Sequence, residues 1–269
     1  MCTTGVLRTS EDEYLLFKNK DFGRTHFDDR IVCEPGVFGV EGITTWAGDD
    51  PYLDRFSGFS IGANAEGVLC CDTNVRTLRD HANYDDLVEI ALREGKDVAS
   101  AIAAVQQAVE AQPYLWGNLI VIDDSASAVL EVRGDRLQVT HAEAPFARSN
   151  HHVVLGAHPE DDDTITTQDR LASAEARVED AESIEDVFAL QASHDEGDTG
   201  ICNHALYQTV YSYVLARRQD ETELFVLRGR PCEHPERIEL TLPLGSSWSL
   251  DAADAFRASY PSARFTVVG

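Results

Sequence analysis

Short apolar runs of β type occur in three blocks along the chain, and two pairs of helical segments separate these blocks. Each run is bounded by turn-forming residues, which is typical of strands in a packed sheet. Blocks of strands that alternate with blocks of helices favour a layered α+β architecture. Two sheets stacked between helix layers are one arrangement that satisfies this order.

The expected elements follow from the apolar periodicity. Val98, Ile102, Val105 and Val109 recur at helical spacing and place one apolar face on a helix. The polar residues 9–13 between the first two apolar runs indicate a hairpin at the start of the chain. Strands are expected at residues 3–8, 14–19, 56–63, 67–72, 118–123, 128–133, 138–142, 208–216, 223–228 and 237–242, and helices at 84–93, 98–111, 167–178 and 184–191.

The chain has 269 residues, without an internal repeat or a linker rich in Pro, Gly or Ser. The acidic run 160–163 and the stretch 194–200 have the composition of exposed loops rather than of domain boundaries. A domain of this length can bury roughly three quarters of its unfolded surface. We therefore expect residues 1–269 to form a single domain.

The chain is strongly acidic: 47 acidic residues face 22 basic ones, for a formal net charge of −25. Such a field repels nucleic acid and anionic membranes. Only Lys18, Lys20 and Lys96 are lysines, so arginine supplies most of the positive charge. A dense carboxylate surface is screened in molar salt, where the Debye length is about 3 Å. A halophilic cytoplasm is our hypothesis, and an acidic protein of an ordinary cytosol is the alternative.

The sequence lacks the patterns of a membrane protein, a secreted protein, a metal site and a nucleotide-binding site. No apolar run reaches membrane-spanning length and the start of the chain lacks a secretory pattern, so a cytoplasmic protein is expected. The six cysteines include no C-x-x-C pair. Cys202-x-His204 and His151-His152 lack further ligands at a defined spacing, so no metal site is predicted. No glycine-rich nucleotide motif is present, so no cofactor is predicted.

Cys2 is the candidate nucleophile. Methionine aminopeptidase removes Met1 when the second residue is small, which would leave Cys2 at the terminus. Its α-amine, with a reference pKa of about 7.7 to 8.0, could then accept the thiol proton. Nucleophile and base would then belong to one residue. Position alone does not distinguish such a nucleophile from a cysteine that stands second in the chain by chance.

The residues after Cys2 strengthen this interpretation. The opening leads through the expected hairpin to Lys18-Asn19-Lys20-Asp21. It resembles penicillin V acylases and bile salt hydrolases, N-terminal-nucleophile (Ntn) enzymes whose second strand carries Arg-Asn-x-Asp. The resemblance implies that Asp21 holds the α-amine and that Lys18 is the cation near the thiol, where it can lower the thiol pKa.

Lys18 stands where that family usually has an arginine, and lysine lacks the planar guanidinium group of arginine. Residues 18 and 21 face opposite sides of a regular strand. A twist or bulge is therefore expected where both approach the terminus.

Three further residues extend the resemblance. Asn74 follows an Asn-x-x-Gly turn that begins at Asn64, and Asn150 lies in Ala147-Arg148-Ser149-Asn150-His151-His152. The resemblance implies that both asparagines form the oxyanion hole. Arg170 matches an arginine that some relatives place beside the nucleophile, and an ordinary exposed helix arginine is the alternative.

The C-terminal part narrows the resemblance to one branch. The runs 200–204, 209–212 and 227–232 are similar in order to the peptidase C45 group, which includes acyl-coenzyme A:6-aminopenicillanic acid acyltransferase. This implies a four-layer αββα Ntn sandwich of two mainly antiparallel sheets. The resemblance also implies a small-molecule amide or acyl substrate, a thioester intermediate and no cofactor. A homo-oligomer is a separate expectation. No propeptide precedes Cys2, so loss of Met1 would suffice.

Two other functions stay open. One is transfer of an acyl group from acyl-CoA to an amine in place of hydrolysis. The other is a catalytically silent Ntn-fold protein that acts by binding, with Lys18 as the sign of lost activity.

Overall fold

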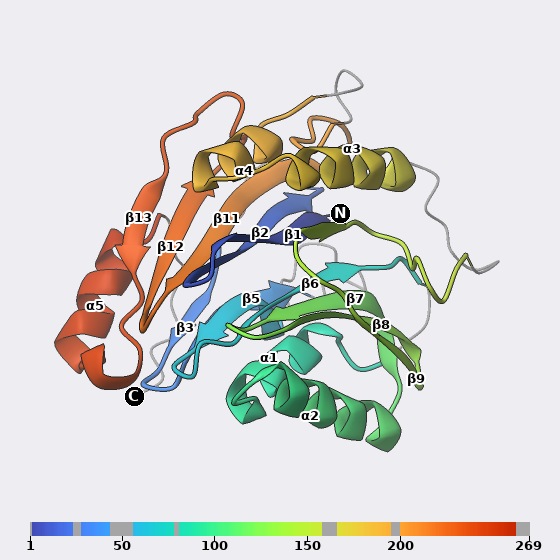
Figure 1. Ribbon diagram of the computed structural model, residues 1–269, viewed down its shortest axis with the longest axis horizontal. Coiled ribbons are helices and arrows are strands. Elements are labelled where there is room, and N and C mark those ends of the chain that lie inside the picture. Colours follow the sequence, from blue (N-terminus) through green and yellow to red (C-terminus); the bar gives the residue numbers. More distant parts are fainter. Residues whose placement is uncertain are drawn as a thin grey trace.

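Two antiparallel sheets stack face to face, and helices cover the outer face of each (Figure 1). The structure is a computed structural model that describes residues 2–23, 28–43, 56–77, 81–157, 166–194 and 200–261. The expected four-layer αββα sandwich is confirmed.

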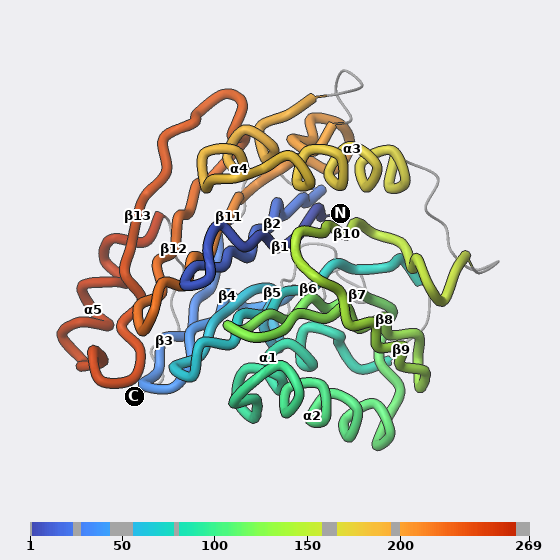
Figure 2. Tube along the Cα trace, in the orientation of Figure 1, coloured from blue at the N-terminus to red at the C-terminus, as the bar shows by residue number. Residues whose placement is uncertain are grey.

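The chain's first strand lies inside the six-stranded sheet, between a short later strand and its own hairpin partner (Figure 2). The strands of this sheet are, in spatial order, β10 (Phe146–Arg148), β1 (Cys2–Ser10), β2 (Glu13–Phe22), β11 (Gln208–Arg218), β12 (Glu221–Arg228) and β13 (Ile238–Thr241). The expected hairpin at the start of the chain is therefore confirmed, and its register pairs Cys2 with Lys20.

The seven-stranded sheet follows the chain order from edge to edge. Its strands are β3 (Ile31–Cys33), β4 (Val37–Ile43), β5 (Phe56–Asn64), β6 (Leu69–Asn74), β7 (Tyr114–Ile122), β8 (Ser127–Gly134) and β9 (Arg136–His141). Asn74 is the last residue of β6. It lies close to the start of β1 because β1 packs against β6.

Two helix pairs form the outer layers. One pair, α1 (Asp85–Glu94) and α2 (Val98–Ala111), covers the seven-stranded sheet, and the other, α3 (Thr167–Glu179) and α4 (Ile184–Gln191), covers the six-stranded sheet. A 3₁₀ turn (Gly245–Ser247) and α5 (Leu250–Ser259) follow β13, and α5 lies beside it. The first residues of α2 and α4 are held by capping boxes at Asp97 and Ser183, which satisfy backbone donors that a helix start leaves unpaired.

The sandwich contains three apolar layers because strand residues alternate between faces. Leu16 of β2 packs between the two sheets, whereas Leu15 packs under α3 and α4. In β6, Cys71 faces the other sheet and Cys70 faces α1 and α2. The inner strands of both sheets are thus buried on both faces, which explains why they read as continuous apolar runs, whereas the edge strands β9 and β13 are largely half-buried or exposed.

Four elements were not expected from the sequence. Strand β4 contains Gly39 and Gly42 and follows Pro35-Gly36, a composition typical of loops, and β3, which precedes that turn, has only three residues. Gly39 is needed because a Cβ there would lie 2.4 Å from the Phe59 ring. The short β10 offers too few residues for a periodic pattern. Helix α5 buries only Ala253, Phe256 and Arg257, so its apolar face is narrow.

None of the described helices is long and apolar enough to cross a membrane.

The layer between the sheets predicts a large stability difference between two leucines. Leu16 is 0% exposed and Leu206 is 73% exposed. We expect Leu16→Ala to lower the free energy of unfolding by about 3 to 5 kcal/mol, because the cavity lies between two rigid sheets. Denaturant unfolding should show no such loss for Leu206→Ala. Equal effects of the two substitutions would contradict this packing.

Candidate active site

Cys2 begins β1 at the end of the sandwich where α3 crosses the six-stranded sheet, and Figure 1 marks the N-terminus there. The next two residues define the faces of β1. Thr3 Oγ1 accepts a hydrogen bond from Arg170 of α3, whereas Thr4 Oγ1 lies 2.8 Å from Cys71 Sγ of the other sheet. By alternation, the Cys2 side chain shares the Thr4 face, between the sheets. Cys2 is 8% exposed.

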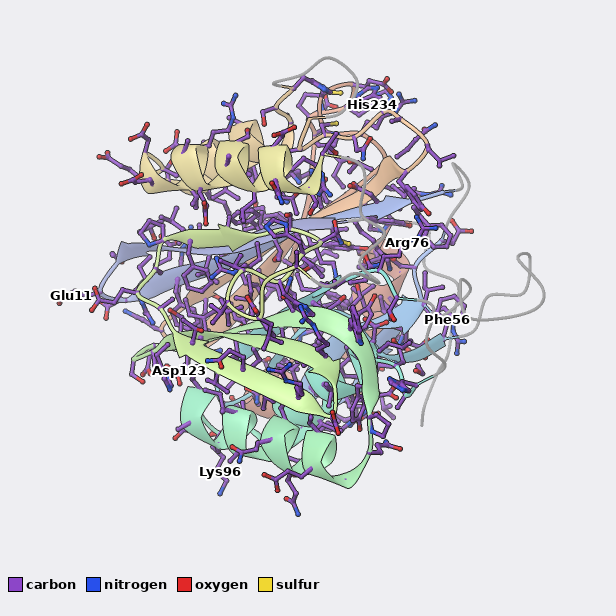
Figure 3. The ribbon with its side chains drawn as sticks, turned by 90° about the vertical axis from the view of Figure 1, so that its right-hand side faces the viewer. Glu11, Phe56, Arg76, Lys96, Asp123 and His234 are labelled. Carbon is purple, nitrogen blue, oxygen red and sulfur yellow. The ribbon has the colours of Figure 1, made fainter. Side chains whose placement is uncertain are left out.

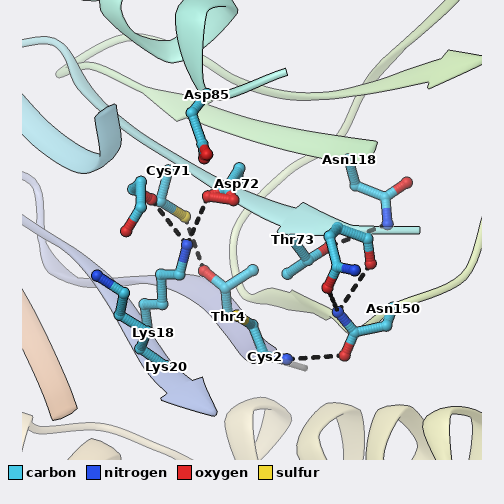
Figure 4. A network of polar contacts seen from close by, with 12 residues as sticks. Cys2, Thr4, Lys18, Lys20, Cys71, Asp72, Thr73, Asp85, Asn118 and Asn150 are labelled. Atoms are coloured by element: carbon cyan, nitrogen blue, oxygen red, sulfur yellow. Dashed lines mark hydrogen bonds and ion pairs between the residues drawn. The ribbon is translucent and has the colours of Figure 1, made fainter. Parts of the chain in front are cut away.

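The backbone nitrogen of Cys2 donates a 2.7 Å hydrogen bond to Asn150 Oδ1 (Figure 4). Arg170 Nη2 donates to the same oxygen at 2.9 Å, and Arg170 Nη1 donates to the Cys2 carbonyl at 2.8 Å. A guanidinium can only donate, so the Asn150 oxygen must face Cys2 and its Nδ2 must face away. The orientation of the Asn150 amide is therefore set by its partners.

The Nδ2 group of Asn150 donates to two acceptors of Asn74, the backbone oxygen and Oδ1, each at 2.8 Å. The Asn74 amide is thereby turned with its oxygen toward Asn150. Among the residues that the structure describes, no acceptor lies in hydrogen-bond range of Asn74 Nδ2, and the side chain is half-buried. The expected pair of asparagines is thus in contact, but only the Asn74 Nδ2 group is available to a bound oxyanion.

A second ring of polar groups holds the segment of Asn150. Thr167 Oγ1 accepts from the Asn150 backbone nitrogen at 2.9 Å, and Ser149 Oγ donates to the Thr167 carbonyl at 2.6 Å. Asn118 Nδ2 and Thr73 Oγ1 both donate to the Ser149 carbonyl, at 3.0 and 2.7 Å. Single hydroxyls and amides carry no sequence pattern, so none of these was singled out from the sequence.

Arg170 is 1% exposed, which excludes the alternative of an ordinary surface arginine. It belongs to the first turn of α3 and extends down to the start of β1. Of the sequence-predicted site residues, it makes the largest number of direct contacts to the Cys2 backbone and to Asn150. A buried arginine needs such acceptors because removing its charge from water is costly.

Asp21 lies on the opposite face of β2 from Lys18, as strand alternation requires. Its Oδ1 accepts from Thr209 Oγ1 at 2.8 Å. Burial raises the pKa of Asp21, and the positive charges of the chain's amino terminus and of Arg170 oppose this rise. The bulge expected to bring Lys18 and Asp21 to the same side is not found in β2, which pairs with β1 without a register shift from Tyr14 to Lys20. A bulge lies instead in β11, which places Thr209 opposite Asp21 and Tyr211 opposite Lys20, so Val210 is the extra residue.

Lys18 is 1% exposed and points between the sheets (Figure 4). Its Nζ donates to Asp72 Oδ1 at 2.6 Å and to the Ser60 carbonyl at 2.8 Å. Burial alone would lower the pKa of Lys18, but Asp72, Cys2 and Cys71 together raise it above its ordinary value. Lys18 is therefore a charged ammonium with a fixed carboxylate partner.

Asp72 has a second acidic neighbour. Burial, followed by the charge of Asp72, raises the pKa of Asp85 well above its usual range, and the two side chains share a hydrogen bond. One proton held by Asp85 thus lets the pair carry a single negative charge against Lys18. Neither aspartate was expected from the sequence. No pattern in the sequence marked Asp72 as the partner of Lys18, since Asp123 also ends an apolar run and accepts from backbone nitrogens instead.

The sequence predicted no metal site because Cys202 and His204 lacked further ligands. In the structure, His194 and Cys232 join them, and one ligand atom from each of the four residues lies within 4.8 Å of all the others. His151 and His152 belong elsewhere, beside Ser149 and Arg133 respectively.

The fold is similar to that of several solved amidases. A C2A variant of the conjugated bile acid hydrolase from Clostridium perfringens superposes with a TM-score of 0.59 at 13% identity, covering 89% of this chain and 92% of that one. Penicillin V acylase from Agrobacterium tumefaciens gives a TM-score of 0.50 at 12% identity, with 90% and 85% covered. The chain therefore has the Ntn-hydrolase fold.

An N-acylethanolamine-hydrolyzing acid amidase ortholog from Caenorhabditis elegans also gives a TM-score of 0.50 at 12% identity, over 80% of this chain and 92% of that one. No family model and no curated protein sequence matches the chain.

The buried charges predict that two isosteric substitutions change the free energy of unfolding by very different amounts. Asp72→Asn leaves the Lys18 ammonium without its carboxylate, so we expect a loss of about 3 to 5 kcal/mol in the free energy of unfolding. Asp85→Asn keeps a donor toward Asp72 and should change this free energy by less than about 1 kcal/mol. Denaturant unfolding at neutral pH measures both, and a larger loss for Asp85→Asn would contradict the protonated state of Asp85.

The same pair predicts a pH dependence. The folded pKa of Asp85 is raised, so its contribution to stability is full below its unfolded pKa, about 4, and is lost as pH rises through the folded value. Relative to Asp85→Asn, the wild-type protein should therefore lose stability as pH rises from about 4.

Proposed function

We propose that the protein is an amidohydrolase of the C45-like Ntn type that cleaves a small-molecule C–N amide bond through a thioester on Cys2. The observation that carries the proposal is the hydrogen bond from the Cys2 nitrogen to Asn150 Oδ1, with Arg170 on the same oxygen. These contacts orient the nitrogen that becomes the α-amine once Met1 is removed. An amine held in this way can act as the base for its own thiol.

The reaction begins with proton transfer from the Cys2 thiol to the α-amine. The thiolate attacks the carbonyl carbon, and the charge that develops on the carbonyl oxygen faces Asn74 Nδ2. The C–N bond then breaks, and the leaving amine takes the proton from the α-ammonium. Water attacks the thioester with the α-amine again as base, which releases the acid and restores the thiol.

Asn150 and Arg170 are positioning residues in this scheme. Asn150 accepts from the base and donates to Asn74, so one side chain aligns the base with the oxyanion donor. Its own Nδ2 hydrogens would become oxyanion donors only if substrate displaced Asn74. We propose that Asp21, from the other face of β2, holds the α-ammonium when it carries the thiol proton, since the amino-terminal charge opposes the rise that burial causes in the pKa of Asp21.

Lys18 supports the nucleophile from between the sheets. Its ammonium lies close enough for the charge of Cys2 to be one of the causes that raise the pKa of Lys18. Because Asp72 already holds Nζ, Lys18 adds a fixed local dipole rather than an isolated charge. This explains how lysine can serve where the resembling family has arginine.

Acyl transfer to an amine uses the same thioester, so the C45-type motifs also allow an acyl-CoA-dependent reaction. Product analysis with and without acceptor amines separates the two. The single domain, the homo-oligomer and the halophilic cytoplasm remain predictions.

Intact mass of the purified protein in high salt tests the proposed nucleophile. We expect loss of Met1 and, with a β-lactam or other acyl electrophile, one adduct that peptide mapping places on Cys2. Cys2→Ser provides the matched control and should form no stable thioester. Retained Met1 with an unreactive Cys2 would contradict the proposal and leave the catalytically silent binding protein.

Two substitutions of Asn74 test the oxyanion donor. Asn74→Ala should lower kcat by about 10²- to 10³-fold with little change in KM, because one oxyanion donor is lost. Asn74→Asp keeps the oxygen that accepts from Asn150 but has no amide donor, so it should fail equally. Activity retained in Asn74→Asp would show that Asn74 only supports Asn150.

A further inference from the structure

A cluster of two thiols and two imidazoles lies at one end of the six-stranded sheet, outside the contacts that the proposed reaction uses. Cys202 Sγ and Cys232 Sγ are 3.4 Å apart, and His204 Nε2 is 3.1 Å from Cys232 Sγ and 3.7 Å from Cys202 Sγ. The His194 ring packs edge-on against the His204 ring, with centroids 4.8 Å apart. Four metal-ligating side chains thus converge on one point.

The backbone explains why residues so distant in sequence meet. Strands β11 and β12 are antiparallel, so the segment before β11 and the segment after β12 leave the sheet at the same end. The Gly229 nitrogen donates to the Val210 carbonyl at 2.7 Å, which joins the second segment to β11. The Cys202 nitrogen donates to the Ser193 carbonyl at 3.0 Å and places His194, after α4, beside Cys202.

We propose that His194, Cys202, His204 and Cys232 form a tetrahedral Cys₂His₂ site for a zinc ion. Ligand bonds of 2.3 Å to sulfur and about 2.0 Å to nitrogen place tetrahedral ligand atoms roughly 3.3 to 3.8 Å apart. The sulfur–sulfur and sulfur–nitrogen distances here are 3.4, 3.1 and 3.7 Å. The ligand atom of His194 lies within 4.8 Å of the other three, so the site needs a small closure by His194, which is exposed as Cys232 is.

The proton balance follows from the neighbours of His204. Arg230 Nη1 donates to His204 Nδ1 at 2.6 Å, so the neutral ring carries its proton on Nε2, directed at Cys232. Zinc replaces that proton at Nε2, and the proton moves to Nδ1. Glu233 Oε1, which lies 3.9 Å from Nδ1, is positioned to accept it in place of Arg230. The two cysteines bind as thiolates, so each releases one proton.

The site would stabilise a segment that supports the proposed active site. Asn203 lies between the ligands Cys202 and His204, and its backbone nitrogen donates to Thr209 Oγ1 at 2.9 Å. The same Thr209 oxygen donates to Asp21 at 2.8 Å. One ion would therefore fasten the segments before β11 and after β12 to α4, on the side of the sheet where Asp21 lies.

A Cys202–Cys232 disulfide is the competing interpretation of two sulfurs at this distance. It would use both sulfurs and leave the convergence of two histidines without a cause. The two interpretations differ in metal binding and in mass, neither of which depends on catalytic activity. The test therefore fails or succeeds independently of the proposed hydrolase reaction.

Cobalt titration of the full-length protein, purified anaerobically with a phosphine reductant, tests the site. We expect one Co²⁺ per chain, thiolate-to-cobalt charge-transfer absorption, visible bands of tetrahedral Co²⁺, and displacement by Zn²⁺. Cys232→Ser should weaken cobalt binding by at least about 100-fold, and His194→Ala should weaken it as well. Zinc should raise the Tm of the wild-type protein by at least about 5 °C, a readout that does not require the variants to fold.

Two substitutions serve as controls. His234→Ala changes an exposed histidine two residues beyond Cys232, at the upper edge of the molecule in Figure 3, and should bind cobalt like the wild type. Cys2→Ala should also bind normally. The proposal is overturned if the reduced protein gives no thiolate charge transfer, or if the bands vanish with Cys2→Ala. Bands that persist in Cys202→Ser and Cys232→Ser, or an intact Cys202–Cys232 disulfide without bound metal, would overturn it too.

Discussion

The side-chain amide of Asn150 joins three layers of the fold at one point. Its oxygen accepts from the Cys2 nitrogen of the six-stranded sheet and from Arg170 of α3, and its nitrogen donates to Asn74 at the end of the seven-stranded sheet. Because each partner belongs to a different element, the amide can make all its contacts only when both sheets and the helix layer are in place. The site is therefore a product of the completed sandwich rather than of a local loop.

Buried charge is the second constraint on this molecule. Two of its three lysines, Lys18 and Lys20, are almost completely buried, although the chain is strongly acidic. Each pairs with a buried aspartate: Lys18 with Asp72 at 2.6 Å and Lys20 with Asp29 at 3.1 Å. Pairing offsets the cost of removing these charges from water, but it contributes little net stability compared with apolar packing. We therefore explain such pairs by the position that they give to a charge. The pair with Asp72 holds the Lys18 ammonium between the sheets, on the side where Cys2 lies.

Much of the secondary structure and the fold class could be predicted from the sequence, because the patterns that indicate them are local. The hairpin after Cys2 and helices α1 to α4 follow from apolar periodicity, and the fold class follows from the order of the elements. The residues that support the site could not be predicted in this way. Thr167 and Asn118 act through contacts with the segment of Asn150, and Cys232 meets Cys202 only because β11 and β12 are antiparallel. Strand β4 was missed because its glycines serve close packing, which a propensity rule interprets as a loop, and β3 was missed because it has only three residues.

A crystal structure of the protein trapped as its acyl-enzyme tests most directly whether Cys2 is the nucleophile and Asn74 the oxyanion donor. We expect Met1 to be absent, the acyl carbon to be bonded to Cys2 Sγ, and the α-amine to lie within hydrogen-bond distance of Asn150 Oδ1. The thioester oxygen should face Asn74 Nδ2. An acyl group on another residue, or a thioester oxygen directed away from Asn74, would contradict it.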